Sequence, residues 1–239
     1  MMRLESEGPP LVLIHGAGAN AAVWEPLHKP LSSFDLYAPD LPGRLGSEGP
    51  APERAEEAAR WVDGELEALE VRDAIVLGHS YGGAVAIELA LRSSRVAALV
   101  LVASGARLRV HPAILEGAER AVSGAAPLPI DFCFTPHTSR DVIDAYARAA
   151  STTPPEATLA DWRACDAFDR RSEVERIGVP VLVTTGAEDA LTPPKYQHYL
   201  VEHLPRAQLE LVERAGHMLP WEQPAKLAAI VRAWASGVG

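Results

Sequence analysis

The stretch IVLGHSYGGAVAIEL, residues 75–89, runs from an apolar segment directly into a helical one with no loop between them. Ser80 stands at the junction, with Gly78 two residues before it and Gly82 two residues after it. A turn this sharp crowds the backbone around the serine, so both flanking positions must be small. The stretch therefore predicts a buried strand, a tight turn with an outward-pointing Ser80 hydroxyl, and a helix that begins at Tyr81.

Strand-like and helix-like segments alternate along the rest of the chain. The strand-like segments, short and rich in Val, Ile and Leu, are Leu11–His15, Asp35–Ala38, Ala74–His79, Ala97–Ala103, Pro180–Thr185 and Gln208–Glu213. The helix-like segments are Ala21–Leu31, Glu53–Leu69, Tyr81–Arg92, Pro193–His203 and Trp221–Trp234. This order predicts an α/β fold with a mostly parallel central sheet and helices on both of its faces. The segment Arg3–Glu7 leaves room for a short antiparallel strand at one edge.

The connection between Ser104 and Gly178 is about twice as long as one helix and a return to the sheet require. Prolines break it into pieces, and three of the four phenylalanines lie in it together with Trp162. Open α/β sheets bind ligands beyond the carboxyl ends of their strands. We therefore expect residues 105–178 to form an inserted helical cap and a return segment, and residues 1–104 and 179–239 to form the core. The alternative is an additional packing layer without a role in ligand binding.

Composition and charge argue against several classes of function. A chain of 239 residues, 48% of them hydrophobic, is sufficient for one large domain with its own core. Its net charge of −10 and its lack of a basic run argue against nucleic acid or an anionic membrane as a partner. The N-terminus lacks a signal-peptide layout, and the longest apolar run is far shorter than the roughly 18 residues that span a bilayer, so we expect a cytoplasmic protein. Cys133 and Cys165 lack the spacing of metal ligands.

Ser80 needs a base before its hydroxyl can act as a nucleophile. Of the eight histidines, His217 lies in a glycine-containing loop between the last strand and the last helix, at the same edge of the predicted sheet as Ser80. Asp189, just past another strand, can orient such a base, with its neighbour Glu188 as a competing acid. The structural alternatives are a helix N-cap for Ser80 and an ordinary loop position for His217. The order and placement of the three residues favour nucleophilic catalysis.

Four stretches together resemble the α/β-hydrolase superfamily, and in particular its small bacterial esterase-like serine hydrolases. They are His15-Gly16, the turn Gly78-x-Ser80-x-Gly82, the loop Gly186–Asp189, and Gly216-His217, in the family order serine, acid, histidine. The segment PDLPG, residues 39–43, resembles the family's loop after its second parallel strand. The chain departs from the pattern at Arg44 and Leu45, where many relatives carry a histidine or an aromatic residue and then a glycine.

The resemblance implies a role for each matched residue. Ser80 would be the nucleophile, His217 the general base, and Asp189 the acid that orients the base. The backbone amides of Ala17 and Tyr81 would form an oxyanion hole for the developing negative charge. The residues expected to line the substrate pocket are Gly18, Phe132, Phe134, Trp162 and Met218. No cofactor and no metal ion are implied.

These features predict a serine hydrolase that acts on small to medium carboxylic esters through an acyl-enzyme on Ser80. A lactonase or a C–C bond hydrolase would use the same three residues, and the sequence does not separate them. Gly16-x-Gly18-x-x-Ala21, with Asp40 after the next strand, also matches a dinucleotide-binding turn and hence a nicotinamide-dependent oxidoreductase. However, no tyrosine is followed by a lysine four residues later, so the usual acid–base pair of single-domain enzymes of that kind is missing. A non-catalytic ligand receptor on the same fold is the remaining alternative.

Overall fold

The computed structural model describes residues 1–44, 46–47, 49–126 and 129–238, and Leu45, named above, lies outside these ranges. Within them the strands are β1 (Met2–Leu4), β2 (Pro10–Ile14), β3 (Asp35–Ala38), β4 (Ala74–His79), β5 (Val96–Val102), β6 (Val181–Gly186) and β7 (Ala207–Val212). They form one sheet in the order β1-β3-β2-β4-β5-β6-β7. Neighbouring strands are parallel except for β1, which pairs with β3 in the antiparallel sense. The predicted mostly parallel sheet with a short antiparallel edge is confirmed.

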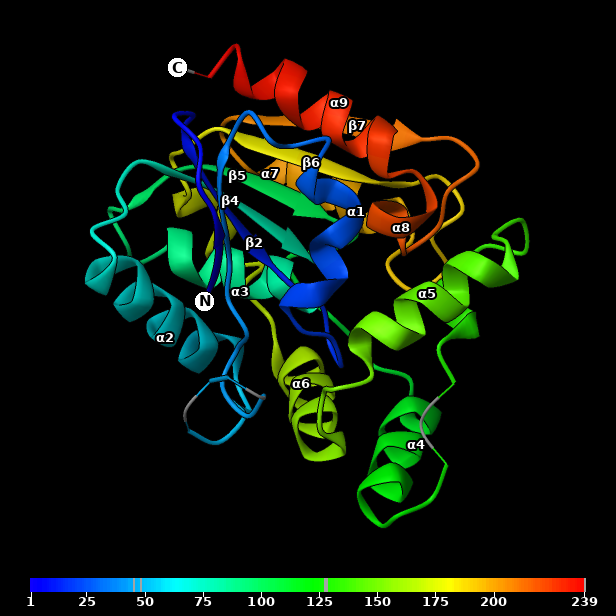
Figure 1. Cartoon of the computed structure of the whole chain (residues 1–239). Coiled ribbons are helices and arrows are strands. Elements are labelled where there is room, and N and C mark those ends of the chain that lie inside the picture. The colour runs from blue at the N-terminus through cyan, green and yellow to red at the C-terminus, as the bar shows by residue number, and fades with distance from the viewer. Residues whose placement is uncertain (45, 48, 127–128, 239) are drawn as a thin grey trace.

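Helices cover both faces of the sheet (Figure 1). One face carries α2 (Ala55–Ala68), α3 (Tyr81–Ala90) and α7 (Lys195–His203), and the other carries α1 (Glu25–His28), α8 (Leu219–Glu222) and α9 (Pro224–Ala235). Alternate side chains of a strand point to opposite faces. In β2, Val12 and Ile14 belong to the core beneath α2 and α3, whereas Leu11 and Leu13 belong to the core beneath α1 and α9. All four side chains are fully buried.

Two helices that the sequence predicts as continuous are divided. The stretch Ala21–Leu31 begins as a 3-10 helix, η1 (Ala21–Trp24), and continues as α1, which ends at His28. The stretch Trp221–Trp234 is divided between α8 and α9. In both cases a proline, Pro26 or Pro224, stands in the first turn of the second helix, where its missing amide hydrogen leaves no bond unmade.

The connection between β5 and β6 forms a layer of helices at the edge of the sheet where the strands end (Figure 1). Its elements are α4 (Pro112–Val122), η2 (Asp131–Cys133), α5 (Arg140–Ala150), α6 (Pro155–Ala167) and η3 (Val174–Arg176). We call this layer the cap. Its outgoing and returning segments meet in an isolated antiparallel bridge between Arg107 and Asp169. The last turn of α6 also enters the core of the sheet through Ala164 and Cys165, so the division at residues 105 and 178 stays a prediction.

The described part of the chain contains neither a disulfide nor an evident metal centre. Cys133 and Cys165 are both free thiols. No group of three or more His, Cys, Asp or Glu side chains among the described residues is placed to hold a metal ion. Within the same ranges, no helix is both long enough and apolar enough to cross a membrane.

Candidate active site

Ser80 occupies the sharp turn between β4 and α3. Its backbone has φ of 53° and ψ of −116°, a conformation of the kind that costs a non-glycine residue about 1–3 kcal/mol. A Cβ atom on Gly78 would lie 2.2 Å from the carbonyl oxygen of Gly82, and one on Gly82 would lie 2.0 Å from that of Ile14, which explains the flanking glycines. The Ser80 hydroxyl makes no capping hydrogen bond to α3, so the alternative role as a helix cap is not adopted.

The ends of three strands bring Ser80, His217 and Asp189 together. Nε2 of His217 lies 3.0 Å from Oγ of Ser80, and Nδ1 of the same ring lies 3.0 Å from Oδ2 and 3.2 Å from Oδ1 of Asp189. All three residues are buried. Glu188, the competing acid, instead faces His137, with 3.7 Å between the carboxylate and Nε2. The arrangement is the one that a serine nucleophile, its base and an orienting acid require.

Asp189 lies in a loop rich in hydrogen-bond donors. Its Oδ1 accepts from the backbone amides of Leu191 and Thr192, both at 2.9 Å, and its Oδ2 accepts from the hydroxyls of Thr185 and Thr192, both at 2.8 Å. Burial by itself raises the pKa of Asp189, but the His217 charge and these hydrogen bonds outweigh it and lower the pKa to about 2. The carboxylate is therefore ionised and fixed in orientation beside the histidine ring.

Two further histidines, at the ends of β2 and β4, are neutral and bind the backbone of the site. Nε2 of His79 donates to the carbonyl oxygen of His217 at 2.9 Å, and burial lowers the pKa of His79 to about 3. Nδ1 of His15 donates to the carbonyl oxygen of Gly16 at 2.9 Å, and its Nε2 accepts from the amide of Leu41 at 3.3 Å. Burial lowers the pKa of His15 well below its usual value. Both rings thus position the loops that surround the triad of Ser80, His217 and Asp189.

The two amides expected to bind an oxyanion have no acceptor among the residues that the structure describes. In the described part of the chain, no carbonyl or side chain accepts a hydrogen bond from the backbone amide of Ala17 or of Tyr81. Ala17 lines the cavity that opens onto Ser80. The next amide along, that of Gly18, differs because it donates to Oδ2 of Asp161 at 2.9 Å. Unpaired amides beside a nucleophile are suited to stabilise a charged tetrahedral intermediate.

The glycine loop does not present the ribose-binding carboxylate of a dinucleotide site. Oδ1 of Asp40 accepts from the amide of Ala21 at 2.7 Å, at the start of η1. The side chain of Asn20 accepts from the amide of Ala22 at 2.9 Å. Both acceptors therefore satisfy amides that a helix start leaves without partners. The match to Gly16-x-Gly18-x-x-Ala21 reflects a loop that places backbone amides beside Ser80.

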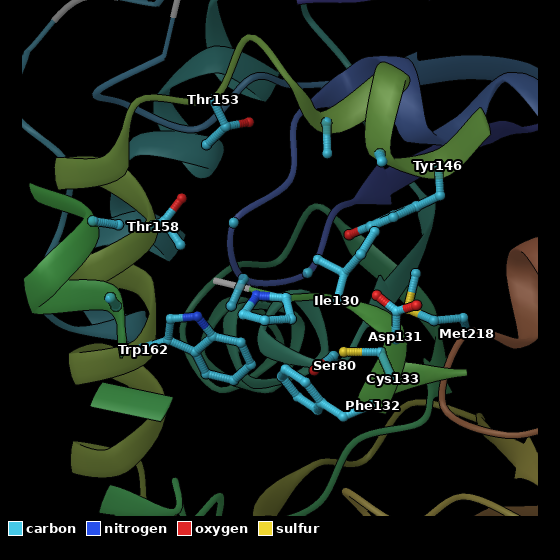
Figure 2. A pocket seen from close by; sticks show the side chains of 18 of the residues that line it. Ser80, Ile130, Asp131, Phe132, Cys133, Tyr146, Thr153, Thr158, Trp162 and Met218 are labelled. Atoms are coloured by element: carbon cyan, nitrogen blue, oxygen red, sulfur yellow. The ribbon is translucent and has the colours of Figure 1, made fainter. Parts of the chain in front are cut away.

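A cavity of about 580 Å³ lies between the triad and the cap (Figure 2). Four of the five predicted pocket residues line it, namely Gly18, Phe132, Trp162 and Met218. The prediction for Phe134 needs correction, because this residue is not among those that line the cavity and is 9% exposed. Its ring packs edge-on against Tyr146, with 5.7 Å between the ring centroids. The chain is extended at Phe134 after η2 ends, which directs the side chain into the core.

Sequence reasoning missed the small residues of the cavity wall. The lining residues not predicted include Ala118, Ala121, Ala125, Ile130, Asp131, Cys133, Tyr146, Ala147, Ala150, Thr153 and Thr158. Pairs of alanines three residues apart on α4 and α5 were a usable signal, since that spacing places both on one helix face. The cavity is therefore walled largely by small and apolar side chains.

Comparisons with known proteins agree with this geometry. A family model described as the alpha/beta hydrolase family matches residues 11–230. A pimeloyl-[acyl-carrier protein] methyl ester esterase of Neisseria meningitidis is 31% identical over 242 residues, which cover 95% of this chain and 93% of that protein. The solved structure of a thermophilic esterase is 31% identical with a TM-score of 0.84, covering 99% of this chain and 93% of that chain. The solved structure of an enol-lactonase from Burkholderia xenovorans LB400 shares the fold, with a TM-score of 0.84 and 24% identity. The match covers 97% of this chain and 92% of that chain.

Proposed function

Because the chain belongs to the alpha/beta hydrolase family, we propose that it hydrolyses small to medium carboxylic esters through an acyl-enzyme on Ser80. The observation that carries this proposal is the hydrogen-bonded series from Ser80 through His217 to Asp189, at the base of a largely apolar cavity. Relatives named as esterases align with almost the whole chain, which supports the ester class.

The contacts allow a two-step reaction. In the first step, Ser80 Oγ attacks the ester carbonyl carbon while Nε2 of His217 takes its proton, and the amides of Ala17 and Tyr81 stabilise the oxyanion. The C–O bond to the alcohol then breaks, and His217 returns the proton to the leaving oxygen. In the second step, His217 takes a proton from the water that attacks the acyl carbon. The bond between the acyl carbon and Ser80 Oγ then breaks, His217 returns the proton to Oγ, and the free acid leaves. Asp189 stabilises the imidazolium in both steps.

The cavity favours an acyl group without a negative charge. Its volume of about 580 Å³ is in the usual range for a small-molecule site, roughly 300–1,000 Å³. Neither lysine nor arginine is among its lining residues in the described chain, and Asp131 contributes a carboxylate to the wall (Figure 2). Arg140 pairs with the Asp131 carboxylate from outside the described lining, so a terminal carboxylate on the acyl chain would meet neither a lysine nor an arginine side chain in the cavity wall itself. An aliphatic or aromatic acyl chain would meet alanine, Ile130 and Trp162.

A panel of nitrophenyl acetate, butyrate, hexanoate and octanoate, together with simple lactones, tests the proposal directly. We expect steady-state hydrolysis by the wild-type protein and loss of at least about 10⁴-fold in kcat for Ser80→Ala. A fluorophosphonate probe should label the wild type at Ser80 and leave the variant unlabelled. Equal rates for wild type and Ser80→Ala would refute the role of Ser80. A burst of one equivalent without steady-state turnover would favour a ligand receptor instead of an enzyme.

A further inference from the structure

A buried ion pair joins the cap to the glycine loop that follows β2. Arg44, in the segment after β3, forms an ion pair with Asp161 on α6, and both side chains are almost completely buried. Arg44 is also the residue at which the chain departs from the loop pattern of many relatives. Removing two charges from water costs several kcal/mol per ion, so such a pair is a weak device for stability alone. The groups that the pair contacts suggest another role.

Both members of the pair bind the backbone of the glycine loop. Oδ2 of Asp161 accepts from the amide of Gly18 at 2.9 Å. Nε of Arg44 donates to the carbonyl oxygen of Ala19 at 2.6 Å, and Nη1 donates to that of Pro42 at 3.2 Å. The two charged side chains therefore form hydrogen bonds with the Gly18 amide and the Ala19 carbonyl, the groups that follow Ala17 in the loop. Hydrogen bonds to charged groups are about twice as strong as neutral ones, so this part of the loop is firmly fixed.

The hydrogen bonds to the Gly18 amide and the Ala19 carbonyl determine which amide of the glycine loop remains available to bind a substrate oxygen. Each peptide unit is planar, so binding the Gly18 amide sets the orientation of the peptide that joins Ala17 to Gly18. Gly18 has φ of 68°, which turns the chain sharply at this point and suits glycine. Asp161 occupies the Gly18 amide, whereas the neighbouring Ala17 amide, in the cavity wall beside Ser80, has no acceptor among the described residues. The position of Ala17 is thereby set by contacts on its C-terminal side.

The side chain of Tyr81, whose backbone amide is the second expected oxyanion donor, lies within the field of the same ion pair. The ring of Tyr81, whose amide is that donor, is fully buried, and its hydroxyl has no hydrogen-bond partner among the described residues. Burial and then the charge of Asp161 raise the pKa of Tyr81 well above its usual value. The Tyr81 hydroxyl therefore lies within the field of Asp161, at the opposite end of the side chain from the backbone amide that is the second expected donor.

We propose that Asp161 and Arg44 are positioning residues that hold the glycine loop so that the Ala17 amide faces the substrate oxygen. The inference rests on the proposed ester hydrolysis and assigns no contact with substrate to either residue. Thr158 and Trp162, on the same helix as Asp161, line the cavity. Helix α6 thus contributes to the wall of the acyl pocket and sets the geometry of the oxyanion hole.

The test compares the wild type with the double variant Arg44→Met/Asp161→Leu, which replaces the pair by apolar side chains and leaves no single buried charge. For nitrophenyl butyrate we expect kcat to fall roughly 10- to 100-fold, below the roughly 100- to 1,000-fold cost of deleting an oxyanion donor. KM should stay within about twofold, because the loss concerns the transition state. The inhibition constant of an aryl trifluoromethyl ketone, whose serine adduct carries an oxyanion, should rise by the same factor as kcat falls.

Glu88→Gln is the matched control for a broken buried charge pair. Glu88 on α3 is almost fully buried and pairs with Arg92 and Arg170, away from the cavity. This variant should lower the Tm while kcat and the inhibition constant stay within about twofold of the wild type. The double variant should show the reverse, with a Tm near that of the wild type and an impaired kcat. Wild-type kcat and inhibitor binding in a folded double variant would overturn the positioning role.

Two measurements separate failure of this inference from failure of the proposed function. Hydrogen exchange at the Gly18 amide needs no turnover, and it should accelerate in the double variant because its acceptor is gone. If the wild type hydrolyses no ester of the panel, the proposed function fails. The rate of Ser80 labelling by a fluorophosphonate then decides the positioning role, since that reaction also develops negative charge on an oxygen. An unchanged labelling rate or unchanged exchange in the double variant would contradict it.

Discussion

Asp189 and Asp161 are both buried aspartates that contact the candidate site, yet their surroundings shift their ionisation in opposite directions. In Asp189, the charge of His217 and a set of hydrogen bonds outweigh burial and lower the pKa to about 2. In Asp161, burial outweighs the charge of Arg44 and the Gly18 amide, and the pKa rises to about 6. Exposure does not explain the difference, because the two residues are 3% and 0% exposed.

The number and origin of the donors explain it. Both oxygens of Asp189 accept hydrogen bonds, and the donors Thr185, Leu191 and Thr192 lie two to four residues away in the chain. In Asp161, both contacts fall on Oδ2, and Oδ1 has no partner in the described part of the chain. A complete set of short-range donors stabilises a buried charge, whereas a partial set leaves the desolvation cost uncompensated.

Of the two aspartates, Asp189 has the complete set of hydrogen-bond donors, and its replacement by asparagine should have the largest effect on activity. A neutral side-chain amide at this position cannot stabilise an imidazolium and favours the wrong tautomer of His217, so kcat should fall by about 10⁴-fold. Steady-state hydrolysis of nitrophenyl butyrate measures the loss. Glu188→Gln, one residue earlier, is the control and should retain activity within about twofold. A loss for Asp189→Asn below about tenfold would contradict the assignment of Asp189 as the orienting acid.

Deleting the Ala17 amide hydrogen tests whether the Arg44–Asp161 pair affects kcat through this one donor. Ala17→Pro removes the N–H and should lower kcat roughly 100- to 1,000-fold, whereas Ala17→Ser keeps it and should remain active. In the Ala17→Pro background, Arg44→Met/Asp161→Leu should cost little more, since both changes remove the same interaction. The coupling is measured as a double-mutant cycle in kcat. Additive losses would show that Asp161 acts independently of the Ala17 amide.

Asp189 has contacts close by in the chain and Asp161 has contacts far away in it, and this difference also separates what the sequence could predict from what it could not. The strands, the turn at Ser80, and the loops that carry Asp189 and His217 all have local signals, because an apolar run ends in turn-forming glycines at each point. Parallel strands then bring these loops to one edge without further information. The sheet followed from such patterns, and the ends of β2 to β7 were placed within one residue, whereas β1 ends at Leu4, three residues before the end of the segment expected for the edge strand.

Contacts between the cap and the core carried no comparable signal. Arg44 and Asp161 are 117 residues apart, and Asp161 and Gly18 are 143 apart, so no spacing rule connects them. Phe132 and Phe134 are only two positions apart, yet the turn after η2 directs one ring to the cavity and the other to Tyr146. Tertiary packing alone decides between such alternatives.

The two carboxylates should give opposite pH dependence of stability. The pKa of Asp189 is lowered from 3.8 to about 2, so its contribution is present above about pH 4 and is lost as the pH falls toward 2. The pKa of Asp161 is raised from 3.8 to about 6, so its contribution is present below about pH 4 and is lost as the pH rises through 6. At about 1.4 kcal/mol per pKa unit, each amounts to about 2–3 kcal/mol.

Urea unfolding of three proteins across this pH range measures both contributions. The free energy of unfolding of the wild type minus that of Asp189→Asn should grow as the pH rises from about 2 to 4. The free energy of unfolding of the wild type minus that of Arg44→Met/Asp161→Leu should shrink as the pH rises from about 4 to 6. Differences that change in the same direction for both variants would remove the distinction between the two aspartates.

The smallest expected effect concerns a single donor to Asp189. Thr184 and Thr185 are adjacent in β6 and both fully buried, but only the Thr185 hydroxyl has a partner in the described chain, Oδ2 of Asp189 at 2.8 Å. Thr185→Val leaves the carboxylate one donor short and should lower the free energy of unfolding by about 1.5 kcal/mol at neutral pH. Thr184→Val removes a buried hydroxyl that makes no hydrogen bond within the described ranges, so it should be neutral or stabilising. Equal losses in the two variants, measured by urea unfolding, would mean that packing rather than the donor set stabilises this loop.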